Sequence, residues 1–387
     1  GGVYPSAIGD FLADVTNRYA GIYFANPGAV RMENMLIRWM CDMIGYPVEA
    51  HGNLTSGGSI ANLIGITTAR DALGIRAAHV PRCVIYVNAQ THHCVHKAIR
   101  IAGLAEATLR QVPLDEHFRM HPGRLEEMIA EDRAAGHIPF LVVASLGSTD
   151  TGAIDPVGAL ATISHANNMW LQVDAAYGGF FALVPEIAPL LKGAGRSDSY
   201  IVDPHKGLFL PYGTGAILVR DAAHLNASHY YRANYMQDAV NTSDEYSPAD
   251  LSPELTKHFR GLRMWLPLQL FGLSPFRAAL KEKWLLARYF HRKIGEAGFT
   301  VGPEPELSVA IYRYEASGLN ANAFNAALVK AVQEDGRIFI SSTMIDGVFW
   351  IRLAVLCFRT HLKQVDLLLE LLIWHRDRLL AAGIARV

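Results

Sequence analysis

Apolar residues recur at helical spacing in the first part of the chain. The apolar positions of a first predicted helix share one face: Ile8, Phe11, Leu12, Val15 and Tyr19. Those of a second predicted helix also share one face: Met32, Leu36, Trp39, Met40 and Met43. Such spacing is the signature of an amphipathic helix. Gly21 is expected to end the first helix, and Gly45 with Pro47 the second, because glycine and proline favour helix termination.

Between residues 53 and 219 the pattern changes to short apolar runs, rich in β-branched residues, that alternate with helical patterns. The runs cover residues 83–87, 140–144, 170–173, 200–202 and 216–219. This alternation predicts βαβ units and an α/β fold whose mostly parallel central sheet is flanked by helices. Ligands of such sheets bind outside the carboxyl ends of the strands, so the residues that follow each run are candidates for chemistry.

A long polar and turn-prone stretch covers residues 226–256 and is typical of a lid. The elements predicted after it are helices at 262–271, 276–297, 322–333 and 364–380 and strands at 308–314, 338–341 and 348–355. We therefore expect two domains. Residues 1–264 hold the N-terminal helices and a large domain, and residues 265–387 form a small C-terminal α+β domain.

The composition excludes several classes of protein. Among 387 residues, 35 Lys and Arg stand against 36 Asp and Glu, so the net charge of −1 leaves no surplus for binding nucleic acid. The apolar runs are too short to span a membrane. Four widely separated cysteines without a C-x-x-C pair predict a cytoplasmic protein. The chain begins with Gly1 rather than Met, which leaves open whether a segment precedes it.

Two charged residues follow predicted strands and suggest a cofactor. Lys206 closes the segment Asp-Pro-His-Lys and could form a Schiff base with an aldehyde, although an isolated lysine in a loop is more often a surface residue. Asp174 follows the run 170–173 and could pair with a protonated ring nitrogen; a helix cap is the alternative. At about 4 Å and an effective dielectric constant near 20, that attraction is worth roughly 4 kcal/mol.

Two further segments add small residues and imidazoles. Thr-Ser-Gly-Gly-Ser at residues 55–59 precedes a helical stretch, where backbone N–H groups suit a phosphate; a serine-capped turn is the alternative. The segment does not match the P-loop or dinucleotide patterns. His92 and His96, with Cys94 nearby, resemble part of a zinc site, but the sequence offers no obvious third ligand, and we predict no metal. His92 is better suited to cover a flat cofactor or to move a proton.

One ligand satisfies all four segments, namely a phosphorylated pyridine aldehyde. Lys206 would hold the aldehyde and Asp174 the ring nitrogen. The segment Gly57, Gly58 and Ser59 would hold the phosphate, and His92 would cover one face of the ring.

Together these segments resemble the group II pyridoxal 5′-phosphate (PLP) decarboxylases, the fold-type-I family that contains aromatic-L-amino-acid, tyrosine, tryptophan, histidine and glutamate decarboxylases. The resemblance runs from Tyr4 to the final helix. Its motifs are T-S-G-G-S at 55, Q-T-H at 90, G-S-T at 147, V-D-A-A-Y at 173, S-D-S at 197, D-P-H-K at 203 and F-R-G-L-R-M-W at 259. A chance match of that ordered set is very improbable.

The resemblance implies roles for individual residues. The residues implied in catalysis are Lys206 as the aldehyde-binding lysine, Asp174 as the partner of the ring nitrogen, His92 and Tyr235. The residues implied in binding the cofactor are Gly57, Gly58, Ser59, His92, Thr149, Asp174, Ala176, Ser199, His205 and Lys206. Ala176 would support the ring face opposite His92. The loop tyrosine is matched to Tyr235, with Tyr230, Tyr231 and Tyr246 as the neighbouring alternatives.

The resemblance also implies an activity and a partner. We expect decarboxylation of an L-amino acid to the amine and CO2, with Tyr235, assisted by His92, returning a proton to Cα. Related aldehyde synthases carry phenylalanine at the loop position, so tyrosine favours amine formation. An aromatic substrate is favoured, and an acidic or other amino acid is the alternative, because the sequence does not place Arg31, Arg232, Arg263 and Arg352. A homodimer whose sites lie at the subunit interface is implied as well.

Overall fold

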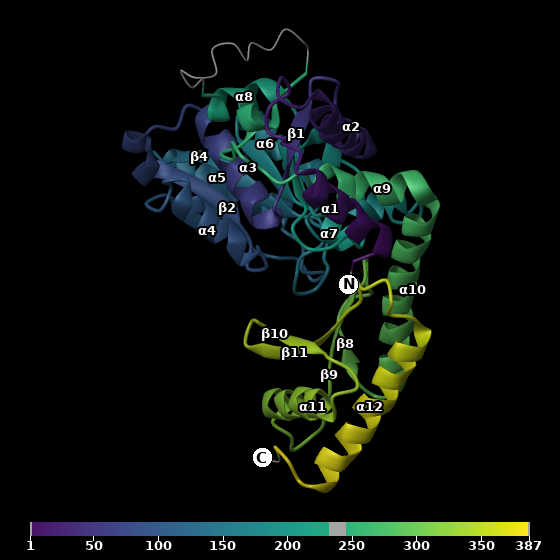
Figure 1. The fold of residues 1–387 in the computed structure, drawn as a ribbon. Helices are drawn as coiled ribbons and strands as arrows, with labels where there is room; N and C mark the ends of the chain where they lie inside the picture. Colours follow the sequence, from purple (N-terminus) through teal and green to yellow (C-terminus); the bar gives the residue numbers. More distant parts are fainter. Residues whose placement is uncertain (1, 232–244, 386–387) are drawn as a thin grey trace. The chain divides into compact units, whose positions relative to one another are not determined.

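The computed structural model describes residues 2–231 and 245–385. They form two compact units, the first made of Gly1–Ser148 with Ile154–Pro275 and the second of Thr149–Ala153 with Phe276–Val387 (Figure 1). The helix α9 (Gly261–Phe271) belongs to the first unit. The domain boundary predicted between residues 264 and 265 lies within α9 and stays a prediction.

The first unit is built on one mostly parallel sheet, with the strand order β1-β7-β6-β5-β4-β2-β3. Its strands are β1 (His51–Thr55), β2 (Cys83–Val87), β3 (Thr108–Gln111), β4 (Ile138–Ser145), β5 (Trp170–Asp174), β6 (Ser199–Val202) and β7 (Gly215–Val219). β3, β2, β4, β5 and β6 are parallel, whereas β7 is antiparallel to both β6 and β1. The predicted largely parallel sheet is confirmed.

Two groups of helices flank this sheet. The helices of the first unit are α1 (Tyr4–Thr16), α2 (Pro27–Ile44), α3 (Gly58–Ala72), α4 (His93–Ile101), α5 (Pro122–Ala134), α6 (Val157–Ala166), α7 (Pro204–Gly207), α8 (Ala222–His229) and α9. α3 packs against α4 and α8, and α5 packs against α6. β2, β4 and β7 are buried along almost their whole length, because helices cover both faces of a parallel sheet.

The ends of the first two helices follow local backbone chemistry. Asn26 caps α2 by accepting a hydrogen bond from the backbone N–H of Ala29, and Gly45 ends α2 in the left-handed conformation at φ +80°. Gly45 was therefore predicted correctly. The expected end of α1 at Gly21 is wrong, since Asn17 adopts the left-handed conformation and stops the helix four residues earlier.

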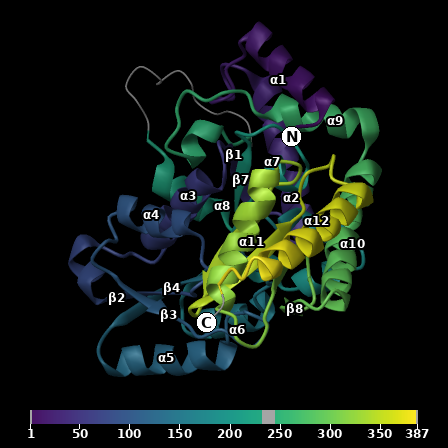
Figure 2. The ribbon, with the colours of Figure 1, turned by 90° about the horizontal axis from the view of Figure 1, so that it is seen from below.

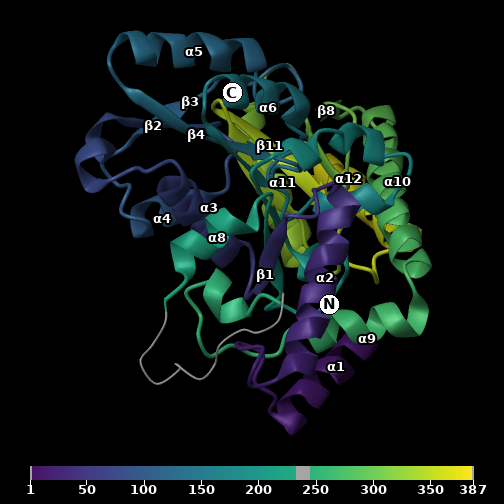
Figure 3. The same cartoon turned by 90° about the horizontal axis from the view of Figure 1, so that it is seen from above.

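The apolar face of α1 is exposed in this chain. α1 packs along α9 (Figure 3). The contact is made through small residues, and an added Cβ on Gly9 would lie 2.5 Å from the carbonyl oxygen of Leu262. On the other side, Phe11 and Val15 are each 64% exposed. An exposed apolar helix face marks a surface that another molecule can cover.

The second unit contains an antiparallel sheet in the order β10-β11-β9-β8. Its elements are α10 (Ser274–Glu296), β8 (Thr300–Val301), β9 (Val309–Arg313), α11 (Ala321–Asp335), β10 (Ser341–Ile345), β11 (Val348–Ala354) and α12 (Leu362–Ala381). α11 and α12 lie side by side (Figure 2), and they share a buried apolar cluster with α10, β9 and β11. No described helix is long and apolar enough to cross a membrane.

The strand predicted at 338–341 is misplaced along the chain. The strand is β10, which starts at Ser341, and Phe339 before it is 82% exposed. β10 pairs with β11 alone among the described strands, and its side chains are mostly half-buried. An edge strand of this kind carries no continuous apolar run, so its pattern is weak.

Candidate active site

Two predicted residues meet at the carboxyl edge of the sheet because their strands are parallel neighbours. β5 ends at Asp174, which pairs in register with Ile201 of β6. β6 ends one residue later, and α7 follows directly with Lys206. This edge is where an α/β sheet binds its ligands.

Asp174 is held in one orientation by hydrogen bonds. Its Oδ1 accepts from the backbone N–H of Ala176 at 3.1 Å, and its Oδ2 accepts from the Asn62 side-chain amide at 3.1 Å. Gln172 fixes that amide in turn by donating to Asn62 Oδ1 at 2.8 Å. The carboxylate therefore presents a fixed negative charge at the edge of the sheet.

Lys206 forms an ion pair with a buried acid. Its Nζ lies 3.1 Å from Oδ2 of Asp203, which is 1% exposed, and His205 Nε2 lies 3.8 Å from the same oxygen. His205 Nδ1 lies 2.7 Å from the carbonyl oxygen of Thr214, which fixes the ring. Burial raises the pKa of Asp203, and the charges of Lys206 and His205 oppose that rise. The other oxygen, Oδ1, has no hydrogen-bond partner among the residues that the structure describes.

Glycines form a cradle beside this acid. Gly57 caps α3 at φ +154°, a conformation that favours glycine, and α3 begins at Gly58. A Cβ on Gly58 would lie 3.1 Å from Asp203 Oδ2 and 3.3 Å from Ala176 Cβ. A Cβ on Gly215 would lie 2.6 Å from both Gly57 Cα and Asp203 Oδ1. Small residues at a helix N-terminus beside a fixed carboxylate and a lysine fit a phosphorylated pyridine aldehyde.

His92 and Cys94 lie at the start of α4. His92 is the N-cap residue, and its Nδ1 accepts from the backbone N–H of Cys94 at 3.3 Å. The Cys94 thiol hydrogen bonds with Ser59, and its pKa is raised to about 12 by burial and by the charge of Asp174, against the effect of Lys206. The thiol is therefore neutral near pH 7. In the described part of the chain, no group of three or more His, Cys, Asp or Glu side chains is arranged to hold a metal ion.

No described contact connects three of the predicted residues to Lys206, Asp174 or the glycine cradle. Ser199 starts β6, where its hydroxyl accepts from Trp170 Nε1 at 2.9 Å and donates to Gln172 at 3.3 Å. Thr149 is exposed and belongs to the second unit, where its carbonyl oxygen accepts from Arg352. Tyr235 lies outside the described residues. The assignment of all three stays a prediction.

Comparison with known proteins identifies the family of the chain. Residues 1–315 match the model of the pyridoxal-dependent decarboxylase conserved domain. The chain belongs to this family. An aromatic-L-amino-acid decarboxylase of Bacillus atrophaeus is 32% identical over 368 residues, which cover 94% of this chain and 76% of the relative. A phenylacetaldehyde synthase of Petunia hybrida is 26% identical, with 93% and 76% covered.

The fold of this decarboxylase matches solved structures of the family. The structure of an Oryza sativa TDC with PLP and tryptamine has a TM-score of 0.92 and 26% identity, and the match covers 98% of this chain and 82% of that one. These comparisons confirm the predicted family, the fold class, the PLP dependence and the assignment to the carboxy-lyases.

Sequence reasoning missed two residues of the candidate site of this decarboxylase, Asn62 and Asp203, and one buried acid outside it, Asp155. Asn62 was not identified, although its position four residues after Gly58 puts both on one face of α3. Asp203 was noted as part of a motif without a role of its own. Asp155 gave no sequence signal, yet it accepts from the backbone N–H groups of Met120 and Ser145 at 2.6 and 2.7 Å. Its contacts become visible only once β4 is placed.

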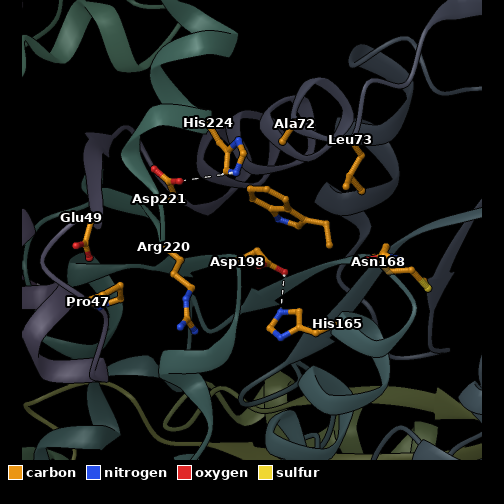
Figure 4. A pocket seen from close by; sticks show the side chains of 12 residues that line it. Pro47, Glu49, Ala72, Leu73, His165, Asn168, Asp198, Arg220, Asp221 and His224 are labelled. Carbon is orange, nitrogen blue, oxygen red and sulfur yellow. Dashed lines mark hydrogen bonds and ion pairs between the residues drawn. The ribbon is translucent and has the colours of Figure 1, made fainter.

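A surface cavity of this decarboxylase lies at the opposite end of β5 and β6. Its volume is about 530 Å³, and its lining includes ion pairs of His165 with Asp198 and of His224 with Asp221 (Figure 4). Of the predicted site residues that the structure describes, none lines this cavity. This cavity is therefore separate from the edge that carries Lys206.

Proposed function

We propose that this enzyme decarboxylates an aromatic L-amino acid to the corresponding amine and CO2. The observation that carries the proposal is the convergence of Lys206, Asp174 and the glycine cradle at one edge of the sheet. A lysine, a fixed carboxylate and a phosphate cradle at one edge are the groups that a PLP enzyme needs.

Each part of the cofactor has a proposed partner. Lys206 would hold the aldehyde carbon, Asp174 the ring nitrogen, and the start of α3 the phosphate. Further contacts are proposed for Ser59, His92, Thr149, Ala176, Ser199 and His205. When bound, PLP supplies a ring that accepts the electron pair of the breaking Cα–carboxylate bond.

The side chains of this decarboxylase would orient the reactants and move a proton. Asp174, fixed by Asn62, keeps a negative charge where the ring nitrogen is proposed to lie. After CO2 leaves, Cα needs a proton, and we assign this step to Tyr235 with His92 as its partner. His92 is suited to that place because its backbone and ring are anchored at the N-terminus of α4.

The charges of the described residues favour an aromatic over an acidic substrate. An acidic side chain requires a cation to receive it. Of the four arginines considered for that role, Arg31 pairs with Glu245, the Arg263 guanidinium bonds to Asp10, and Arg352 donates to backbone carbonyl groups. Arg232 lies outside the described residues. The aromatic assignment has a further support in the Bacillus relative, an aromatic-L-amino-acid decarboxylase, and in the tryptamine of the Oryza structure.

A panel of L-amino acids tests the proposal. The PLP-loaded enzyme is given aromatic, acidic and aliphatic L-amino acids, while CO2 is recorded and the organic product is identified. We expect CO2 and amine from an aromatic substrate, and we expect Lys206→Ala to lose amine formation together with the visible absorption of bound PLP. An exposed-lysine variant, Lys192→Ala, should keep both. Release of CO2 from acidic substrates alone would contradict the aromatic assignment.

An aldehyde synthase is the second candidate, favoured by the similarity to the Petunia enzyme. Oxidative decarboxylation and deamination consumes O2 and yields aldehyde, CO2, ammonia and hydrogen peroxide, so the products separate the two activities. We expect amine from the enzyme and a shift to aldehyde, ammonia and peroxide in Tyr235→Phe. Unchanged amine production in that variant would show that the loop role belongs to another residue.

We also propose that the enzyme is a cytoplasmic homodimer whose active sites lie at the subunit interface. The exposed apolar face of α1 supports the dimer, because a second copy of the chain could cover it. The wide separation of the four cysteines in the sequence, without a C-x-x-C pair, supports a reducing compartment.

A further inference from the structure

The carboxyl group of Asp203 lies at the point where the proposed phosphate and aldehyde sites meet. Its Oδ2 pairs with Lys206 at 3.1 Å and would lie equally close to a Cβ on Gly58, the first residue of α3. Its Oδ1, 2.6 Å from where a Cβ on Gly215 would lie, is buried and lacks a hydrogen-bond partner within residues 2–231 and 245–385. One acid therefore faces both ends of the proposed cofactor site.

This placement creates a charge conflict when PLP binds. A phosphate monoester carries a charge of about −1.5 to −2 near pH 7, and a buried carboxylate beside it would repel it. In the structure the Lys206 ammonium balances the charge of Asp203. Lys206 is also the group assigned to the aldehyde, so the same event that brings the phosphate would break its ion pair with Asp203. An unpaired buried charge of this kind is costly.

We propose that Asp203 takes up one proton from solvent when PLP binds, and that its carboxyl group then donates a hydrogen bond to the cofactor phosphate. The proposal rests on the function proposed above, because it requires the phosphate at the start of α3. The step forms one O–H bond from a carboxylate and a solvent proton, and no electron is transferred. Oδ1 of Asp203, which lacks a hydrogen-bond partner in the described residues, would thereby donate a hydrogen bond to the phosphate.

Burial and the neighbouring groups of Asp203 together favour its protonation once PLP binds. Burial raises the pKa of Asp203 and the nearby charge of Asp174 raises it further, whereas Lys206 and His205 lower it. On α4, the Cys94 thiol has a pKa of about 12 and stays neutral, so it adds no charge. When the phosphate arrives and Lys206 turns to the aldehyde, a negative charge is added beside Asp203 and the ion pair that lowers its pKa is broken.

Calorimetry tests the proton uptake without measuring activity. PLP is titrated into the apoenzyme near pH 7 in buffers of different ionisation enthalpy, which gives the number of protons bound. The unaltered enzyme should take up one proton more than Asp203→Asn, whose amide donates a hydrogen bond without titrating. The dissociation constant of PLP for the unaltered enzyme should rise, relative to the variant, by up to about tenfold per pH unit.

Asp198→Asn is the matched control. Asp198 is a partly buried acid directly before β6, held by Leu171 N–H and His165 at the other end of that strand from Lys206, and its pKa is also raised by burial. The control should bind PLP with the same proton count as the unaltered enzyme. Equal proton counts for the unaltered enzyme and Asp203→Asn would overturn the proposal.

Infrared spectroscopy gives a second measurement that needs no variant. A holoenzyme-minus-apoenzyme difference spectrum should gain a carboxylic-acid carbonyl band that shifts when aspartate is labelled with ¹³C. Absence of that band would overturn the proposal even if Asp203→Asn does not fold. The proposed function fails differently, by loss of the Lys206-dependent visible absorption or of amine formation in the unaltered enzyme.

Discussion

At the scale of single residues, the site depends on partners that hold the chemically expected groups. Lys206 and Asp174 follow from their places at strand ends, but Asp203 and Asn62 gain their roles only from contacts across the fold. Asn62 lies 112 residues from Asp174 in the sequence. A helix-face pattern cannot specify which of its polar residues will meet a strand end that far away.

Replacing Asn62 by leucine should release Asp174 from its fixed orientation. The change keeps the branched shape of the side chain but removes the donor to Asp174, a partly buried contact, and the acceptor for Gln172, a buried one. We expect a loss of about 1–3 kcal/mol in the free energy of unfolding and weaker PLP binding, by about tenfold. Urea denaturation and PLP titration measure the two effects.

The control for this change lies on the same helix. Thr68 is buried on α3, where its hydroxyl donates to the carbonyl oxygen of Ile64 and lies 3.5 Å from His229 Nε2. Thr68→Val should cost stability without changing PLP affinity. If both variants weaken PLP binding equally, Asn62 has no specific part in holding Asp174.

At the scale of elements, apolar runs predicted the buried strands better than the edge strands. β2 coincides with its predicted run, and β4, β5, β6 and β7 contain theirs, because helices cover both of their faces. β1, β3 and β10 were missed or misplaced. β3 reads Thr-Leu-Arg-Gln and is largely exposed, so its hydrogen bonds to β2 leave little trace in hydrophobicity. The sequence predicts a phosphate site at Gly57 and Gly58, which stays a prediction, and it does not indicate Gly215 on β7 beside them.

Gly215→Ala should disturb the cradle. The added Cβ would lie 2.6 Å from Gly57 Cα, a backbone atom that cannot move as a side chain does. We expect PLP affinity to fall by about tenfold or more, since a misplacement of about 1 Å has large effects in binding sites. Gly158→Ala on α6 is the control, because its nearest atom would be 3.7 Å away, and helix propensity should make it neutral or slightly more stable.

Asp155 connects elements through a buried carboxyl group and makes stability depend on pH. Burial raises its pKa to about 6, against hydrogen bonds from Met120 and Ser145 that lower it. The folded state then holds a proton that the unfolded state loses near pH 4, so the contribution of Asp155 is full below that value. It falls as the pH rises to about 6 and levels off above it.

Urea denaturation at intervals between pH 4 and pH 7 checks this dependence. The unfolding free energy of the unaltered enzyme, minus that of Asp155→Asn, should decrease over the range and then become constant. The exposed acid Asp42 provides the control, as Asp42→Asn should leave the pH profile unchanged. A difference that grows with pH would mean that the hydrogen bonds of the carboxylate outweigh its burial.

At the scale of the whole molecule, the helical period of α1 identified an apolar face but not what that face contacts. The structure buries the opposite, small-residue side of α1 against α9, where Gly9 allows close approach. The sequence could not indicate this, because large apolar residues usually face the core of their own chain. A face of this kind is stable in water only when another surface covers it.

Charges placed on that face should therefore separate the proposed dimer. Phe11 and Val15 are exposed in the chain, so Phe11→Glu with Val15→Glu should leave the fold intact while opposing burial against a second copy. Sedimentation should give the mass of two chains for the unaltered enzyme and of one chain for the double variant. Val48→Glu, at a position 82% exposed outside α1, should remain a dimer.

If the sites are completed by the partner subunit, the monomeric variant should also lose amine formation. Raising the protein concentration until the dimer forms again should restore amine formation in proportion to the dimer. A double variant that sediments as two chains would assign the interface to another surface.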